Sequence, residues 1–154
     1  MKRYIHYNSN AYDKERLKKA LTTERLYGRS FKPHGLWASP VNAEIGWKEW
    51  CEDQDFHVDR LEKSFEFTLS PEAKVLTINK LEDAADFLIV DYMGWYTTLY
   101  NLNHSLIYSR YDAMEVIMSS DYINLHGNNV FNPWDVDSIC IWNPEIIVPY
   151  AAKC

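Results

Sequence analysis

The sequence has few cysteines, no long apolar run and no apolar leader. Its three cysteines, Cys51, Cys140 and Cys154, are widely spaced and form no C-x-x-C pair, which argues against a disulfide framework and against a zinc knuckle. No apolar stretch approaches the roughly 20 residues that cross a bilayer. Residues 4–8 are too polar for the apolar region of a secretory signal. We therefore expect a cytoplasmic protein that does not span a membrane.

Common catalytic and metal motifs are also missing. The sequence contains no G-x-G-x-x-G, no Walker loop and no G-x-S-x-G, which excludes the most recognisable dinucleotide-binding, P-loop and hydrolase patterns. Its five histidines are scattered singly, without H-x-H or H-x-x-x-H, so no metal site is expected. The net charge of -6 disfavours non-specific binding to nucleic acid. A small anionic ligand would therefore need a local pocket.

The composition is that of a folded domain. Of 154 residues, 47% are hydrophobic and 25% are charged, close to the average of globular proteins, and the length suits one domain over residues 1–154. Aromatic residues make up 15%, with 6 Trp and 11 Tyr. So many flat side chains suit either a bulky core or a pocket that stacks a ring.

The hydrophobic pattern predicts an α+β chain. Strands are expected at residues 1–7, 36–39, 65–69, 74–78, 113–118, 138–142 and 146–148, and helices at 12–22, 42–56 and 80–92. Residues 70–73 have turn chemistry, so the strands on either side of them are predicted to form an antiparallel hairpin. Residues 95–106 fit a helix or a loop, and residues 121–133 are expected to be a polar connection.

Three segments, taken in order, resemble the ADP-ribosyltransferase family. Residues 4–9 contain His6 and are similar to the opening strand of the diphtheria-toxin-like and poly-ADP-ribose-polymerase-like branches, where a histidine or arginine holds the adenosine ribose. Residues 35–39, followed by Trp47, resemble the family's strand of a glycine, an apolar, an aromatic and two small residues, which leads into a helix with an aromatic residue.

The third segment lies near the carboxyl end. Residues 143–149 are similar to the family segment in which the second of two acids, spaced by one residue, is the catalytic glutamate, and Glu145 falls on that position. Asn143 stands at the position of the first of these two residues, where other members of the family carry an acid or a glutamine. The resemblance implies split antiparallel sheets with flanking helices around an NAD cleft. It also implies a mono-ADP-ribosyltransferase acting on a protein target, such as a small phage or toxin effector.

The resemblance also implies roles for particular residues. Glu145 would hydrogen-bond the 2′-hydroxyl of the nicotinamide ribose, where a carboxylate stabilises the oxocarbenium-like transition state. His6 would donate to the adenosine ribose. Gly35 and Leu36 would hold the nicotinamide amide through the backbone, and Ser39 would steady the site from the adjoining turn.

The resemblance specifies less closely which ring stacks on nicotinamide and which residues contact the pyrophosphate. Trp47 would stack on nicotinamide, with Trp37 or Tyr12 as alternatives, and Arg29 or Lys32 would meet the pyrophosphate together with backbone N–H groups. Each of these residues also has a structural interpretation as core, turn or solvated strand.

Other carboxylates and other functions stay open. Glu115, and the pair Asp135 and Asp137, are rival acids, and the pair suits a divalent cation in a nucleotide-sugar transferase. A second hypothesis is an inactive protein of the same fold that acts as a protein-binding inhibitor or adaptor through exposed Trp95 and Tyr96. A third is an RNA 2′-phosphotransferase or a nucleic-acid-directed ADP-ribosyltransferase, which the acidic charge disfavours.

Overall fold

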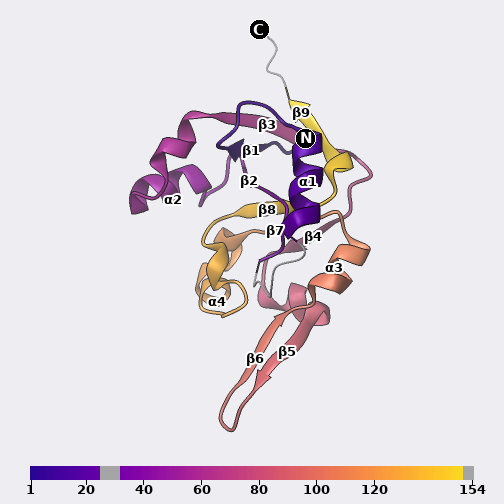
Figure 1. Ribbon diagram of the computed structural model, residues 1–154. Coiled ribbons are helices and arrows are strands. Elements are labelled where there is room, and N and C mark those ends of the chain that lie inside the picture. The colour runs from indigo at the N-terminus through magenta and orange to yellow at the C-terminus, as the bar shows by residue number, and fades with distance from the viewer. Residues whose placement is uncertain (25–31, 151–154) are drawn as a thin grey trace.

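A curled sheet of seven strands forms the body of the molecule (Figure 1). The computed structural model describes residues 1–24 and 32–150. Across the sheet the strand order is β4-β7-β8-β2-β1-β3-β9, with β4 and β7 parallel and the other neighbours antiparallel. The strands are β1 Tyr4–Tyr7, β2 Leu36–Pro40, β3 Ser64–Leu69, β4 Val75–Ile78, β7 Ala113–Val116, β8 Ser138–Ile141 and β9 Ile147–Tyr150. The chain is therefore of the mixed α+β class.

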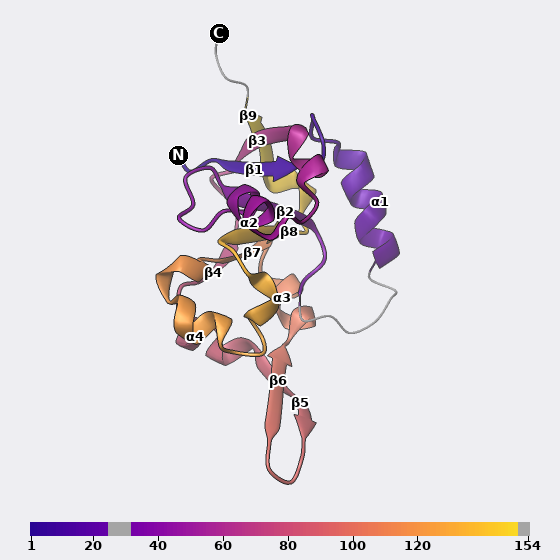
Figure 2. The same cartoon turned by 90° about the vertical axis from the view of Figure 1, so that its left-hand side faces the viewer.

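Short helices lie around this sheet (Figures 1 and 2). The α-helices are α1 Lys14–Glu24, α2 Trp47–Gln54, α3 His104–Arg110 and α4 Tyr122–His126. Turns of 3₁₀-helix occur at Val58–Glu62, Leu81–Phe87, Met118–Ser120, Asn132–Trp134 and Pro144–Ile146. None of the helices within residues 1–24 and 32–150 is long and apolar enough to cross a membrane.

A separate two-stranded hairpin extends away from the body (Figures 1 and 2). It consists of β5 Leu88–Met93 and β6 Thr98–Leu102, which pair with each other and with no strand of the large sheet. Its base is anchored to the body: Asn101 and Leu102 are buried, Asn129 donates to the Tyr100 carbonyl, and the backbone N–H of Asn103 donates to the carbonyl of Phe87.

The centre of the large sheet supplies most of the core. Every residue of β7 and β8 is buried, as expected for strands covered on both faces. Glu115 is the charged exception in β7: its carboxylate accepts hydrogen bonds from the Lys2 ammonium at 3.0 Å and from the Tyr4 hydroxyl at 3.1 Å. The largest fully buried side chains are Trp134, Phe67, Phe131, Ile78, Leu102, Ile107, Met114, Met118, Leu125, Ile139, Ile141 and Val116.

Most of the predicted strands, and the first helix, are confirmed to within a few residues. The second helix is shorter than predicted. It begins at Trp47, because Gly46 is its N-cap with extended backbone angles. It ends where Asp55 adopts a left-handed conformation and donates its N–H to two helix carbonyls, an arrangement typical of helix C-termini.

The predicted hairpin of residues 65–69 and 74–78 is wrong. The turn exists, with the Ala73 N–H donating to the Ser70 carbonyl, but the two strands part after it. β3 pairs with β1 and β9, whereas β4 pairs in parallel with β7. Ser70 donates its N–H to the carbonyl of Ile146, which holds the end of β3 beside β9.

The middle of the chain also departs from the prediction. The helical pattern of residues 80–92 is realised only as the 3₁₀ turn at Leu81–Phe87, after which the chain becomes β5. Its run of β-branched and aromatic residues favours a strand over helix propagation. Residues 95–106 form β6 and the start of α3, and the predicted connection at 121–133 contains α4.

Candidate functional site

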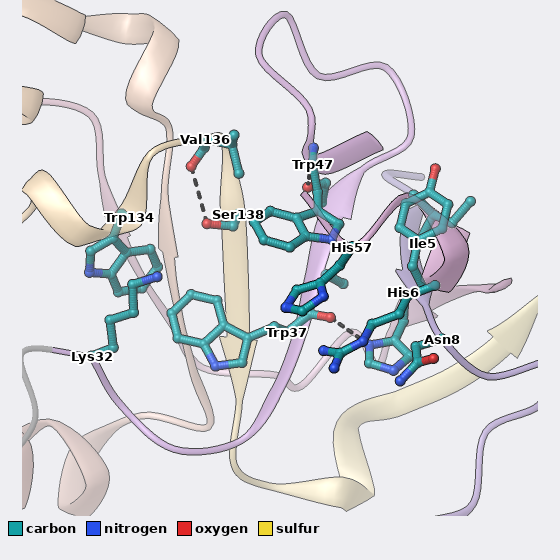
Figure 3. A pocket seen from close by; sticks show the side chains of 14 residues that line it. Ile5, His6, Asn8, Lys32, Trp37, Trp47, His57, Trp134, Val136 and Ser138 are labelled. Carbon is teal, nitrogen blue, oxygen red and sulfur yellow. Dashed lines mark hydrogen bonds between the residues drawn. The ribbon is translucent and has the colours of Figure 1, made fainter. Parts of the chain in front are cut away.

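A cavity of about 340 Å³ opens where β1, β2 and α2 meet the loop before β8 (Figure 3). Its volume lies at the lower end of the range typical of small-molecule sites. The lining residues are Ile5, His6, Tyr7, Asn8, Lys32, Trp37, Ala38, Ser39, Trp47, His57, Arg60, Trp134, Val136 and Ser138. Five of them were singled out from the sequence: His6, Lys32, Trp37, Ser39 and Trp47.

Tryptophan rings form the walls of the cavity. Trp37 packs edge-on against Trp134 with ring centroids 4.8 Å apart, and the Lys32 ammonium lies 5.1 Å from the Trp37 ring centroid. Trp47 stacks on Trp50, outside the cavity, at 5.4 Å and 13°. The wall rings are thus held rigidly by other side chains, and Figure 3 shows them facing the same space. Such a cavity suits a flat ring.

His6 has a defined hydrogen-bonding state. Its Nδ1 lies 2.6 Å from the carbonyl oxygen of Trp37, which can only accept, so Nδ1 carries a proton. Burial lowers the pKa of His6 below its ordinary value, partly opposed by that carbonyl, and the charge of Arg16 lowers it further. The ring is therefore neutral at pH 7 and its Nε2 is an acceptor. In this state Nε2 can accept a hydrogen bond from a ligand.

The lowered pKa of His6 gives a testable result. Its NMR titration midpoint is expected below the model-peptide value of about 6.5. Because the folded state disfavours the charged ring, the stability from this group is present above about pH 6.5 and lost as pH falls through the lowered pKa. His6→Gln should remove that resonance and that acid-sensitive part of stability. A His6 midpoint above the reference value would contradict the assignment.

Ser39 and the residues before it have mainly structural contacts. The Ser39 hydroxyl accepts a hydrogen bond at 3.2 Å from the N–H of Trp47, which satisfies one of the free donors at the start of α2. Gly35 lies against the Ile141 carbonyl of β8, and Leu36 packs on the core. Ser39 thus positions Trp47 at the cavity, while Gly35 and Leu36 are not among the lining residues.

The cavity lining is cationic, although the chain is acidic. Lys32 and Arg60 contribute ammonium and guanidinium groups, and the lining contains no aspartate or glutamate. Burial lowers the pKa of Lys32, and the nearby Asp135 opposes this shift. His57 adds a second imidazole to the lining. This local charge suits an anionic ligand in a protein whose overall charge would repel one.

Unusual backbone angles are concentrated beside the cavity. The described residues include four non-glycine residues with positive φ: Asn8, Asp55, His57 and Asp135. Asn8 and His57 line the cavity, and Asp135 lies between two lining residues. Asn, Asp and His are the residue types that adopt this conformation most readily, and such residues often cluster at functional sites.

Glu145 does not line the cavity. It lies in the 3₁₀ turn before β9, where its carboxylate accepts a hydrogen bond from the Lys14 ammonium at 2.7 Å and lies 3.8 Å from that of Lys18. Its side chain is 61% exposed. The hydrogen bond from Lys14, with the charges of both lysines, lowers the pKa of Glu145. Glu145 is therefore ionised and paired with α1.

Two aromatic rings separate Glu145 from His6. The His6 ring contacts Phe65 at 5.2 Å, and Phe65 contacts Tyr12 at 6.1 Å. The Tyr12 hydroxyl then donates to the carbonyl of Pro144, next to Glu145. Tyr12, an alternative ring platform in the sequence interpretation, is thus outside the cavity lining.

Asn143 holds the turn that carries Glu145. Its side-chain oxygen accepts from the N–H of Glu145 at 3.1 Å, and its amide nitrogen donates to Asp112 at 2.8 Å. The residue that departs from the family pattern therefore has a local structural function here.

The rival carboxylates have partners of their own. Asp137 is buried and accepts from the N–H and the hydroxyl of Ser119, both at 2.7 Å. Asp135 pairs with His126 at 3.5 Å. Within the described ranges, no group of three His, Cys, Asp or Glu is placed to hold a metal ion.

Sequence reasoning missed several lining residues. His57, Arg60, Trp134 and Ser138 come from segments far from β1 and β2, and no local motif connects them. Asn8 lies within residues 4–9, the segment that is similar to the opening strand of the family, but the sequence gave it no role of its own. Arg29, proposed as a phosphate contact, lies outside the described residues. Comparison with known proteins adds no relative: no family model, curated protein or solved structure matches the chain.

Proposed function

We propose that the cavity binds NAD, and that the protein transfers ADP-ribose from NAD to a protein. The observation that carries the binding proposal is the combination of tryptophan walls with a lining that has two cations and no carboxylate. Flat rings joined by a pyrophosphate match this chemistry, because the rings stack and the phosphates pair with Lys32 and Arg60. The proposal that ADP-ribose is transferred depends on the resemblance of residues 4–9, 35–39 and 143–149 to segments of ADP-ribosyltransferases.

The transfer step would break the bond between nicotinamide and ribose. Nicotinamide leaves with the bonding electron pair, a nucleophile of the target attacks the anomeric carbon, and the nucleophile loses its proton. A carboxylate stabilises the developing cation by binding the 2′-hydroxyl. Glu145 lies outside the cavity lining and is paired with Lys14. It would take this role only if the turn that carries it moved toward the ribose and the contact with Lys14 were broken.

A second candidate function is NAD binding without transfer, by an adaptor or inhibitor. The specific observation in its favour is that Glu145 is paired with α1 and that the cavity lining contains no acid. The two functions share the ligand and differ in chemistry, so one set of variants separates them.

Binding is measured first, by tryptophan fluorescence and calorimetry. NAD is expected to quench the emission, because three of the six tryptophans line the cavity. Trp37→Ala should weaken NAD binding at least about fivefold, since one lost aromatic stacking contact is typically worth 1–3 kcal/mol. Trp95→Ala, far out on the hairpin, is the matched control and should bind as the wild type does. No binding of NAD by the wild type would refute both functions.

Transfer is measured with labelled NAD and a cell lysate. The wild type is expected to label a protein band that resists RNase and DNase, and Glu145→Gln should lose the label while keeping NAD affinity. Glu82→Gln, at an exposed position of the 3₁₀ turn Leu81–Phe87, is the control. NAD binding without any label would favour the second function, and a label removed by nuclease would indicate a nucleic-acid target.

A further inference from the structure

The β5–β6 hairpin carries large apolar side chains that the described residues leave wholly or partly exposed. Trp95 and Tyr96 at its tip are 97% and 101% exposed. Exposed apolar side chains also follow both strands: Ile89, Val90, Tyr92, Met93, Leu99 and Tyr100. Between residues 88 and 102, Asp91 is the only charged residue. So many exposed large apolar side chains on one element typically mark an interface.

Both faces of the hairpin are apolar. Val90 pairs with Tyr100 across the strands, and Tyr92 pairs with Leu99 beyond an irregularity at Asp91. Because side chains alternate along a strand, Tyr100 and Leu99 point to opposite faces, and each face therefore has an aromatic and an aliphatic member. A hairpin that packed one face on its own body would be apolar on that face only.

The hairpin also has two open edges. Among the described residues, β5 and β6 pair only with each other, so each leaves one row of backbone N–H and C=O groups without a strand partner. In β6, the Tyr100 carbonyl accepts a hydrogen bond from the side-chain amide of Asn129. An isolated two-stranded hairpin is marginally stable in water and gains stability from added strands or packing. An open apolar edge favours pairing with another strand.

We propose that two copies of this chain associate through their β5–β6 hairpins about a two-fold axis. Charge is one argument. Each chain carries a net charge of -6, so two bodies repel, and the hairpin holds one charged residue and projects away from the body (Figure 2). Contact through this nearly neutral element keeps the acidic surfaces apart. The hairpin has no lysine or arginine to attract an anionic lipid surface.

The available area is the second argument. Summed over both faces and the tip, the exposed fractions of the eight apolar residues correspond to on the order of 1,000 Å² per chain. A stable interface needs roughly 800 Å² from each partner, so the contact has to use the tip and both faces of the hairpin. A two-fold axis is the ordinary symmetry of such a pair, because one self-complementary patch then serves both copies. Trp95 and Tyr96 are the expected hot spots. This proposal is independent of what the cavity binds.

Sedimentation equilibrium at several protein concentrations tests the proposal. The wild type is expected to be a dimer, and the double variant Trp95→Ser with Tyr96→Ser should dissociate at least about a hundredfold more readily, as expected for two hot-spot aromatics. The matched control is Ile123→Ser on α4, where a side chain of 84% exposure is replaced outside the hairpin. It should remain a dimer.

Two outcomes would overturn the proposal. One is a wild type that stays monomeric at every concentration. Binding of this monomer to phosphatidylcholine vesicles would overturn the proposal in the same way. The other is a dimer that the double variant retains. Far-ultraviolet circular dichroism and the thermal midpoint of the double variant should match the wild type, because both replaced side chains lie outside the core. A loss of dimer with these signals unchanged therefore supports the contact itself.

Discussion

Raising the pH above 10 is expected to destabilise the protein by about 1.4 kcal/mol for each pH unit through the Tyr4 phenol alone. Burial, and then the charge and hydrogen bonding of Glu115, raise the pKa of Tyr4 far above its ordinary value. Above pH 10 the unfolded chain therefore loses the phenol proton while the folded chain keeps it. Because the folded state then binds more protons, stability falls as pH rises. Urea unfolding from about pH 8 to about pH 11 measures the slope.

Tyr4→Phe separates this effect from other alkaline titrations. The variant should lose about 1–3 kcal/mol at pH 8, because the buried carboxylate of Glu115 loses a donor, but its stability should fall less steeply above pH 10. Some slope will remain, since burial also raises the pKa of Tyr12 to about 12. Tyr122→Phe, at an exposed position of α4, does not touch Tyr4 or Glu115 and should keep the slope that Tyr4 produces. Equal slopes for Tyr4→Phe and the wild type would contradict the explanation.

Gly35→Ala is expected to lower the free energy of unfolding by about 1–3 kcal/mol or more. A Cβ at this position would overlap the carbonyl oxygen of Ile141 and meet the Cys140 sulfur at 3.0 Å. The obstructing atoms belong mainly to the backbone of β8 at the centre of the sheet, and therefore cannot move aside without distorting the pairing with β2. Equilibrium denaturation in guanidinium chloride measures the loss.

Gly94→Ala is the matched control for that substitution. Its Cβ would meet only the Tyr92 side chain, on the exposed hairpin, and this side chain can rotate away. We expect little change in stability there. Comparable losses at the two positions would show that the close approach of Gly35 to β8 is not the cause.

Local sequence signals predicted the strands of the large sheet, but they predicted the pairing of those strands and the elements between residues 80 and 133 poorly. Alternating apolar and polar residues identified β3 and β4, and the proline and glycine residues around residues 36–39 set the bounds of β2, because these signals lie within a few residues. Pairing of β4 with β7 depends on a contact between residues 75–78 and 113–116, which no local pattern encodes. The turn at residues 70–73 suggested a hairpin because turn chemistry specifies the bend but not the strand that follows.

The residues of the candidate site also fall into two groups: those that short sequence segments predict and those that only the fold brings to the cavity. His6, Trp37 and Trp47 were singled out from short segments, and the fold brings them to one cavity. Trp134 joins them only through packing against Trp37, a contact between residues almost 100 positions apart. The pairing of Glu145 with Lys14 is likewise non-local, so the segment that resembled a catalytic motif gave no sign of it.

The interleaved strand order bears on how the chain is synthesised. β8 lies between β7 and β2, and β9 pairs with β3. During translation, β2 and β3 therefore leave the ribosome long before their outer neighbours exist, and they expose unpaired edges until residues 138–150 emerge. Chaperone dependence and aggregation of nascent chains are expected to be greatest in that interval.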